Sequence, residues 1–128
     1  MSEADDLQRR TERFADDTIR FVQGLPKTQT AQRIAAQLHD SSTSTAANYR
    51  AARRARSHRE FTAKIGVVSE EADESVFWYQ RLVNAKITSD VAVDPLLEEA
   101  VQLAKIFAAT YRTAKRRRSR RNDADRDQ

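Results

Sequence analysis

The chain has 128 residues, enough for one domain with a single core, and 33% of them are charged against 39% hydrophobic. Its formal net charge is +4, its sequence pI is about 9.8, and it contains only two Gly and two Pro. So few turn residues argue against a sandwich or barrel, and the absence of Cys excludes disulfides, thiolate zinc sites and a Cys nucleophile.

The first predicted helix runs from about Asp5 to Gln23. Apolar or small side chains recur there in alternating steps of four and three, the pattern of a helix that lies in a bundle. These side chains are Leu7, Thr11, Phe14, Thr18, Phe21, Val22 and Leu25. Gly24 follows in the position of a helix C-cap, and Pro26 prevents the helix from continuing.

The second predicted helix runs from about Thr30 to Arg54, and the middle of its stripe is small and hydroxylated. The stripe consists of Ile34, Leu38, Ser41 or Ser42, Thr45, Tyr49 and Ala52. Ser and Thr are tolerated in a helix where a neighbour approaches closely and the hydroxyls bond to their own helix's carbonyls. The segment therefore predicts a close helix–helix contact rather than a catalytic serine, since no elbow turn surrounds it.

The third predicted helix runs from Ser57 to about Ala85. Ser57 is the expected N-cap, and Glu60 is expected to complete a capping box with it. The apolar stripe consists of Phe61, Ile65, Val68, Ala72, Ser75, Tyr79 and Leu82. Gly66 lies in the helix interior, where Gly costs about 1 kcal/mol relative to Ala unless another side chain packs against it.

The fourth predicted helix starts with Asp94 as its N-cap and Pro95 as its first residue, and it is expected to fray near Arg117. Its stripe consists of Leu97, Ala100, Ala104, Phe107, Tyr111 and Ala114. A second apolar face consists of Leu96, Leu103 and Ile106. Two apolar faces are more than one thin bundle buries easily, so the pattern predicts that several chains associate.

These four segments predict an all-α protein, an antiparallel up-down four-helix bundle over residues 1–115. Residues 116–128 are predicted to be a disordered tail, because a basic run is followed by an acidic tip with almost no apolar side chain. The basic run spans Lys115 to Arg121, and the acidic tip contains Asp123, Asp125 and Asp127.

Five arginines surround the predicted turn between the second and third helices: Arg50, Arg53, Arg54, Arg56 and Arg59. In an antiparallel hairpin Arg53 lies too far from Glu71 to pair with it, so its partner is expected to be local, in another chain, or an external anion. Arg56 and Glu60 form one local pair. Two interpretations stay open for the cluster. It is a solvated helix end, or it binds phosphate, whose geometry the guanidinium fork matches.

Other kinds of site are less favoured by the sequence. Di-iron bundles use Glu-x-x-His pairs, and neither His39 nor His58 has a Glu three residues before it. The aromatic side chains on the apolar stripes are expected in the core: Tyr49, Trp78, Tyr79 and Tyr111. One acidic patch is either a solvated face or a surface that meets the arginines of a neighbouring subunit: Glu70, Glu71, Asp73 and Glu74.

A series of short motifs runs through the first three predicted helices: Arg10-Thr11 and Phe14-Ala15; Leu25-Pro26; Gln37-Leu38 and Ser41-Ser42-Thr43-Ser44; Asn48-Tyr49 with Ala51; Arg53, Ala55-Arg56-Ser57 and Glu60-Phe61; Lys64, Glu71-Ala72-Asp73-Glu74 and Trp78. In order and spacing, over about Leu7 to Lys115, the series resembles the four-helix-bundle family encoded in intervening sequences of bacterial 23S rRNA genes. This sequence departs from the family pattern at one point, because Ala51 directly follows Arg50 where the pattern has an acidic residue before the alanine.

This resemblance implies an up-down bundle that assembles into a ring-like homopentamer. The accessory variability determinant of diversity-generating retroelements is related to the same family. It is a basic protein that binds nucleic acid and partners a reverse transcriptase. For most of the family, no activity is established.

The sequence thus predicts a non-enzymatic homo-oligomer, a pentamer by the resemblance, that binds RNA or DNA through arginines and without a cofactor. The candidate nucleic-acid-binding residues are Arg50, Arg53, Arg54, Arg56, Arg59, Lys115, Arg116, Arg117, Arg118, Arg120 and Arg121. The alternative is a structural or protein-interaction scaffold, in which these arginines pair with acidic residues of neighbouring subunits. No apolar run approaches the ~18 residues of a membrane span, and the N-terminus is unlike a signal peptide, so a cytoplasmic location is expected.

Overall fold

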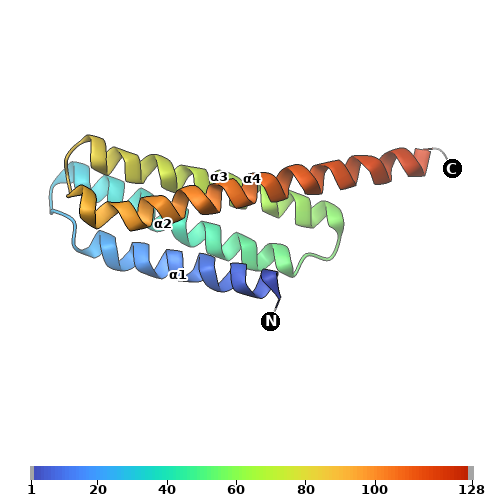
Figure 1. The fold of residues 1–128 in the computed structure, drawn as a ribbon, viewed down its shortest axis with the longest axis horizontal. Helices are drawn as coiled ribbons and strands as arrows, with labels where there is room; N and C mark the ends of the chain where they lie inside the picture. Colours follow the sequence, from blue (N-terminus) through green and yellow to red (C-terminus); the bar gives the residue numbers. More distant parts are fainter. Residues whose placement is uncertain (1, 127–128) are drawn as a thin grey trace.

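The computed structural model describes residues 2–126, which form four helices. In chain order they are α1 (Glu3–Gln23), α2 (Gln29–Arg53), α3 (His58–Asn84) and α4 (Asp90–Arg126). Successive helices run in opposite directions along one long axis (Figure 1). The expectation of an all-α, antiparallel up-down four-helix bundle is therefore confirmed.

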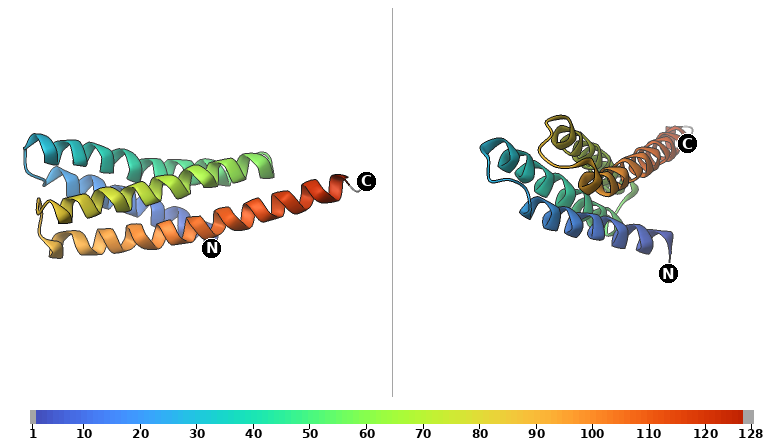
Figure 2. Two further views of the ribbon diagram at one scale, coloured as in Figure 1. Left: turned by 90° about the horizontal axis from the view of Figure 1, so that it is seen from above. Right: turned by 60° about the vertical axis from the view of Figure 1, so that its left-hand side comes forward.

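The two ends of the bundle differ in what they contain. We call the end with the α1–α2 and α3–α4 connections the loop end, on the left in Figure 1. The opposite end, which holds the α2–α3 turn and the N-terminus, is the junction end. Beyond it α4 continues as a single projecting helix, which both views of Figure 2 also show.

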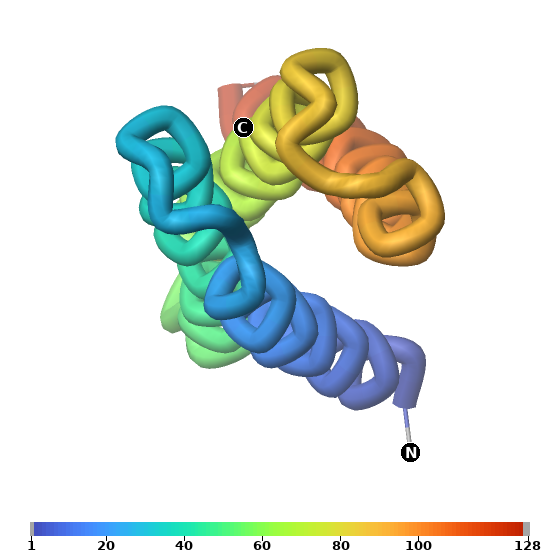
Figure 3. The backbone as a smooth tube through the Cα atoms, turned by 90° about the vertical axis from the view of Figure 1, so that its left-hand side faces the viewer, coloured from blue at the N-terminus to red at the C-terminus, as the bar shows by residue number. Residues whose placement is uncertain are grey.

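The neighbouring helices of the bundle pack against one another to different extents. The contacts of α3 with α2 and with α4 are extensive, whereas α1 and α4 touch only sparsely and lie apart in the end-on view of Figure 3. An ion pair links α1 to α4: the Nε and Nη2 atoms of Arg10 donate to the two carboxylate oxygens of Glu99 at 2.8 and 2.7 Å.

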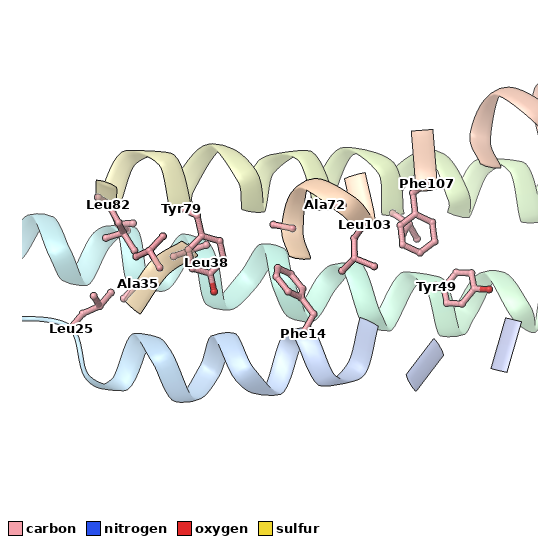
Figure 4. Packing of buried hydrophobic residues seen from close by; sticks show 14 of the residues in the cluster. Phe14, Leu25, Ala35, Leu38, Tyr49, Ala72, Tyr79, Leu82, Leu103 and Phe107 are labelled. Carbon is pink, nitrogen blue, oxygen red and sulfur yellow. The ribbon is translucent and has the colours of Figure 1, made fainter. Parts of the chain in front are cut away.

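The predicted apolar stripes meet along the whole length of the bundle (Figure 4). Leu38, Tyr79 and Leu82 are fully buried toward the loop end, while Tyr49 and Phe107 pack together toward the junction end, with ring centroids 5.2 Å apart. Each buried aliphatic or aromatic side chain of this kind contributes roughly 1.5–3 kcal/mol of transfer free energy. Of the four stripe aromatics, Tyr49 and Tyr79 are buried, as predicted, and Trp78 and Tyr111 are half-buried at the edge of the core.

The hydroxylated middle of α2 makes the close contact that its composition predicts. The Oγ atoms of Ser41 and Ser75 lie 2.8 Å apart between α2 and α3, and both side chains are buried. Thr45 donates its hydroxyl to the carbonyl of Ser41 at 2.7 Å. The hydroxyls thus satisfy one another or their own helix, which allows the two backbones to approach.

Two local predictions for α3 have different outcomes. Gly66 is explained, because a Cβ atom there would lie 3.0 Å from the ring of Tyr111. Ser57 is the N-cap, since its hydroxyl accepts the backbone N–H of Glu60 at 3.0 Å. The capping box is only half formed, because the Glu60 carboxylate accepts the N–H of Arg56 at 3.2 Å instead of that of Ser57.

The predicted start of α4 at Asp94 is wrong, since the helix begins one turn earlier at Asp90. The Ser89 hydroxyl accepts the N–H of Ala92 at 3.4 Å and so caps this earlier turn. The extra turn brings Val93 into the core, where it is fully buried. Pro95 then lies inside the helix, where its missing N–H removes one backbone hydrogen bond.

Helix α4 continues past Arg117, where fraying was predicted, and it reaches Arg126. Its last part contains no Gly or Pro, Arg is a good helix former, and Arg126 approaches Asp123 at 4.0 Å one turn apart. Disorder of the tail in solution stays a prediction, as does the domain boundary at residue 115. Asp127 lies outside the described residues.

Candidate nucleic-acid interface

The junction end separates the five turn arginines into groups with different surroundings. Arg50, Arg54 and Arg56 lie around one shallow hollow of about 440 Å³, which Lys64 also lines. This hollow lies beside α2 and the first turns of α3. Arg59 belongs to a different hollow, and Arg53 points to α1. The cluster that looks continuous in the sequence is therefore divided in space.

Arg53 is already paired within the chain. Its Nη2 atom donates to the Asp5 carboxylate at 2.8 Å, and its Nη1 atom donates to the Gln8 side chain at 2.7 Å. The hydrogen bond from Arg53, followed by those from Ser2, lowers the pKa of Asp5 to about 2. The expectation of a local, intermolecular or external partner is thus wrong, because it considered only the α2–α3 hairpin and not α1.

Arg56 makes the local contact that was predicted, but the contact is weak. Its Nε atom lies 4.0 Å from the carboxylate of Glu60, and the arginine side chain is 92% exposed. An exposed pair of this kind contributes little to stability. Arg56 therefore keeps most of its capacity to meet an external anion.

A second hollow, of about 400 Å³, brings the two basic regions of the sequence together. Arg59, at the start of α3, lines it with Arg118 and Arg121 of α4. We call this cavity, with its three arginines, the basic hollow. Its other lining residues are Ser57, His58, Asn122 and Asp125. Arg118 and Arg121 are one helical turn apart and share a face of α4. The site therefore exists because α4 continues past the connection between α2 and α3.

The other residues of the basic run lie elsewhere on α4. The Lys115 ammonium lies over the Tyr111 ring, 5.3 Å from its centroid, and the Nε atom of Arg116 is 3.5 Å from the carbonyl of Arg112. Arg117 lines a neighbouring hollow, and Arg120 is exposed outside these hollows. Of the six basic residues of this run, only two thus share a hollow with a junction arginine.

The guanidinium groups of the basic hollow are available to an anion. Within residues 2–126, none of Arg59, Arg118 and Arg121 makes an ion pair, whereas Arg53 and Arg10 do. The hollow also lies at the N-terminus of α3, where the helix dipole favours negative charge. Asp125 is the one acidic residue in its lining. The site has the charge and the shape to hold a phosphate group.

The adjoining hollow, of about 370 Å³, is less charged and contains two rings. His58 and Phe61 line it, together with Ala109, Thr110, Thr113, Ala114 and Arg117. The ring centroids of His58 and Phe61 are 6.3 Å apart. Sequence reasoning considered His58 only as a metal ligand, and the signal that it missed is the position of His58 at the first turn of α3, beside Arg59.

The acidic patch of α3 lies on a different part of the molecule. Glu71 is half-buried there, and this burial, with the neighbouring charges of Glu74 and Glu70, raises its pKa. In the described part of the chain, no three acidic or histidine side chains come together as metal ligands would. Between residues 2 and 126, no helix is both long and apolar enough to cross a bilayer.

Comparisons with known proteins add one likeness of fold. No family model and no curated protein matches the sequence. A solved structure from Bacteroides thetaiotaomicron, described as a protein of unknown function from the S23 ribosomal protein family, matches with a TM-score of 0.74. It is 21% identical, and the match covers 81% of this chain and 96% of that one. The likeness shows a shared four-helix fold, which agrees with the fold that the sequence resemblance implies.

Proposed function

We propose that this protein is a non-enzymatic, homo-oligomeric helical bundle that binds RNA or DNA electrostatically at its junction end. The observation that carries the proposal is the basic hollow, in which Arg59 meets Arg118 and Arg121 although the two regions are far apart in the sequence. Arg50, Arg54 and Arg56 extend the positive surface around the α2–α3 turn. We exclude Arg53 from the proposed binding residues, because its guanidinium already donates hydrogen bonds to Asp5 and Gln8 of α1.

The chemistry of these groups fits a phosphate backbone better than a small substrate. Guanidinium forks pair with phosphate oxygens, and several of them on one surface give affinity without sequence specificity. The hollows are shallow and lie on the outside of the bundle, so they suit a strand that passes over the surface. A pentameric ring, as the family resemblance implies, repeats the surface five times and strengthens binding through multivalency.

A scaffold without nucleic-acid binding is the second candidate, and specific features favour it. Phe77 is 45% exposed and Val67 is 38% exposed on α3, the helix that carries the acidic patch. Apolar side chains beside acidic ones suit a protein interface that is rimmed by charge. Under this hypothesis the junction arginines form ion pairs with the acidic patch of a neighbouring copy.

One titration separates the two candidates. Binding of a generic RNA is measured by fluorescence anisotropy over a series of salt concentrations, with light scattering to give the oligomeric state. We expect the triple variant Arg59→Gln, Arg118→Gln, Arg121→Gln to bind more weakly and to reduce the slope of log affinity against log salt by about 2–3. The control is Arg13→Gln, Arg33→Gln, Lys105→Gln, which removes equal charge from exposed positions elsewhere.

Each result decides something. If the triple variant binds as the wild type does, the basic hollow is not the site. If the wild type binds no RNA even at low salt, and the triple variant instead disrupts the oligomer, the scaffold reading replaces the proposal.

A further inference from the structure

We propose that the junction end recognises single-stranded nucleic acid, with a phosphate in the basic hollow and a base against the rings of His58 and Phe61. This inference rests on the proposed function and narrows it to one class of ligand. Its basis is that the basic hollow and the ring-lined hollow adjoin, because His58 lines both. A charged compartment beside an aromatic one matches the two halves of a nucleotide.

The ring-lined hollow offers the groups that a base requires. His58 and Phe61 are both half-buried, so each leaves part of its ring exposed beside the hollow. Every nucleobase has a π-face, so stacking on such rings tolerates any sequence. Thr113 also lines the hollow, and within residues 2–126 its hydroxyl forms no side-chain hydrogen bond. That hydroxyl can bind the edge of the base.

His58 is held in a defined orientation. Its Nε2 atom lies 2.9 Å from the carbonyl oxygen of Ala114. A carbonyl only accepts hydrogen bonds, so Nε2 must carry the hydrogen of this bond. In the neutral ring, Nδ1 is then an acceptor for an amino or hydroxyl group of the nucleotide. The same bond joins the start of α3 to the point at which α4 leaves the bundle.

This geometry favours single-stranded over double-stranded nucleic acid. In a duplex each base is paired and stacked between its neighbours, so its π-face is covered and the protein reaches only the backbone and the base edges in the grooves. A single strand can place an unstacked base in the ring-lined hollow while its phosphate contacts Arg59, Arg118 or Arg121. The rings therefore favour a single strand, and the arginines bind both forms.

The test compares a fluorescein-labelled oligothymidylate of about 12 nucleotides with a duplex of equal length at the same salt concentration. The variant His58→Gln keeps an N–H donor for the Ala114 carbonyl but removes the ring. Phe61→Leu, a second variant, keeps most of the apolar volume. The matched controls are His39→Gln and Phe21→Leu, which remove the same side chains outside the site, and Phe21 is half-buried as Phe61 is. Circular dichroism checks that helix content is unchanged.

We expect the wild type to bind the single strand at least about 10-fold more tightly than the duplex, and each site variant to lose about 5- to 10-fold for the single strand only. A 2-aminopurine in the centre of the strand should be quenched by the wild type and less so by His58→Gln. Equal binding of both forms, unchanged in the variants, overturns this inference but leaves the proposed function standing.

Two other results are also decisive. If the site variants weaken single-strand and duplex binding alike, His58 acts by holding α4 in place, and the base contact is rejected. If the wild type binds neither probe nor the generic RNA, the proposed function itself fails.

Discussion

The loop end and the junction end of this bundle are built from different kinds of residue. At the loop end, Leu38 of α2, Leu82 of α3 and Val93 of α4 are fully buried and belong to one core. At the junction end the core stops at Phe107 and Ala114, and arginines line hollows beside a helix that continues into solvent. The contrast teaches that stability and ligand binding are placed in different parts of one simple fold, so substitutions should separate them.

The largest effect is expected from Leu82→Ala at the loop end. Leu82 is fully buried, and truncation of such a side chain removes burial and leaves a cavity, at a cost of about 2–5 kcal/mol. Urea unfolding followed by circular dichroism measures the free energy of unfolding. The matched control is Val91→Ala, because Val91 is 84% exposed and its loss should change stability by less than ~0.5 kcal/mol. Equal effects of the two variants would contradict the placement of the core.

A smaller effect is expected at a buried polar pair near the loop end. The Tyr79 and Thr18 oxygens lie 2.7 Å apart, and both side chains are fully buried. Tyr79→Phe should cost about 1–2 kcal/mol, because the Thr18 hydroxyl loses its partner. The double variant with Thr18→Val should recover part of this loss, since no polar group then lacks a partner. Additive losses in this double-mutant cycle would mean that the two groups do not interact.

The burial of Tyr79 can also be tested by raising the pH above 10. Burial raises the pKa of Tyr79 well above its ordinary value of 10, although the bond from Thr18 opposes the shift. A raised pKa in the folded state means that stability is full below pH 10 and falls as the pH rises further. Ultraviolet absorbance should show tyrosine ionisation that is delayed until unfolding, and this delayed signal should be smaller in Tyr79→Phe, which keeps Tyr49, whose pKa burial also raises.

Local features of the helices followed from the sequence because they depend on neighbouring residues. The N-cap at Ser57 and the C-cap at Gly24 depend on residues within one turn, and the small hydroxylated side chains of α2 predicted a close helix contact without revealing that Ser75 of α3 is the partner of Ser41. The start of α4 was missed because Val93 gains burial in the core, a tertiary effect that outweighs the cost of Pro95 inside a helix.

The candidate site was predictable only in part. The arginines were recognised by composition, but the meeting of Arg59 with Arg118 depends on a helix that continues past the point where fraying was expected. The pairing of Arg53 with Asp5 depends on α1 lying beside the end of α2, which spacing along the chain does not reveal. Sequence patterns identify which residues carry charge, and the topology decides which of them remain available.

A modest, pH-dependent effect is expected from Arg53→Gln at the junction end. The pKa of Asp5 is lowered to about 2, chiefly because Arg53 donates a hydrogen bond to its carboxylate. A lowered pKa in the folded state adds stability above the ordinary value of 3.8, and this is lost as the pH falls toward 2. The wild type should therefore lose more stability than Arg53→Gln between pH 4 and pH 2, measured by thermal unfolding. Parallel curves would contradict the pair.

The smallest effect on stability is expected from the basic hollow, where the effect on binding is largest. Arg59, Arg118 and Arg121 are like charges at one surface, so neutralising all three removes repulsion rather than a stabilising pair. The triple glutamine variant should unfold within ~0.5 kcal/mol of the wild type, slightly more stable at low salt and equal at high salt. The control with Arg13, Arg33 and Lys105 changed to Gln should show no such salt dependence. A clear loss of stability in the hollow variant would mean that these arginines hold α4 against α3, and that the junction end, like the loop end, is built for stability.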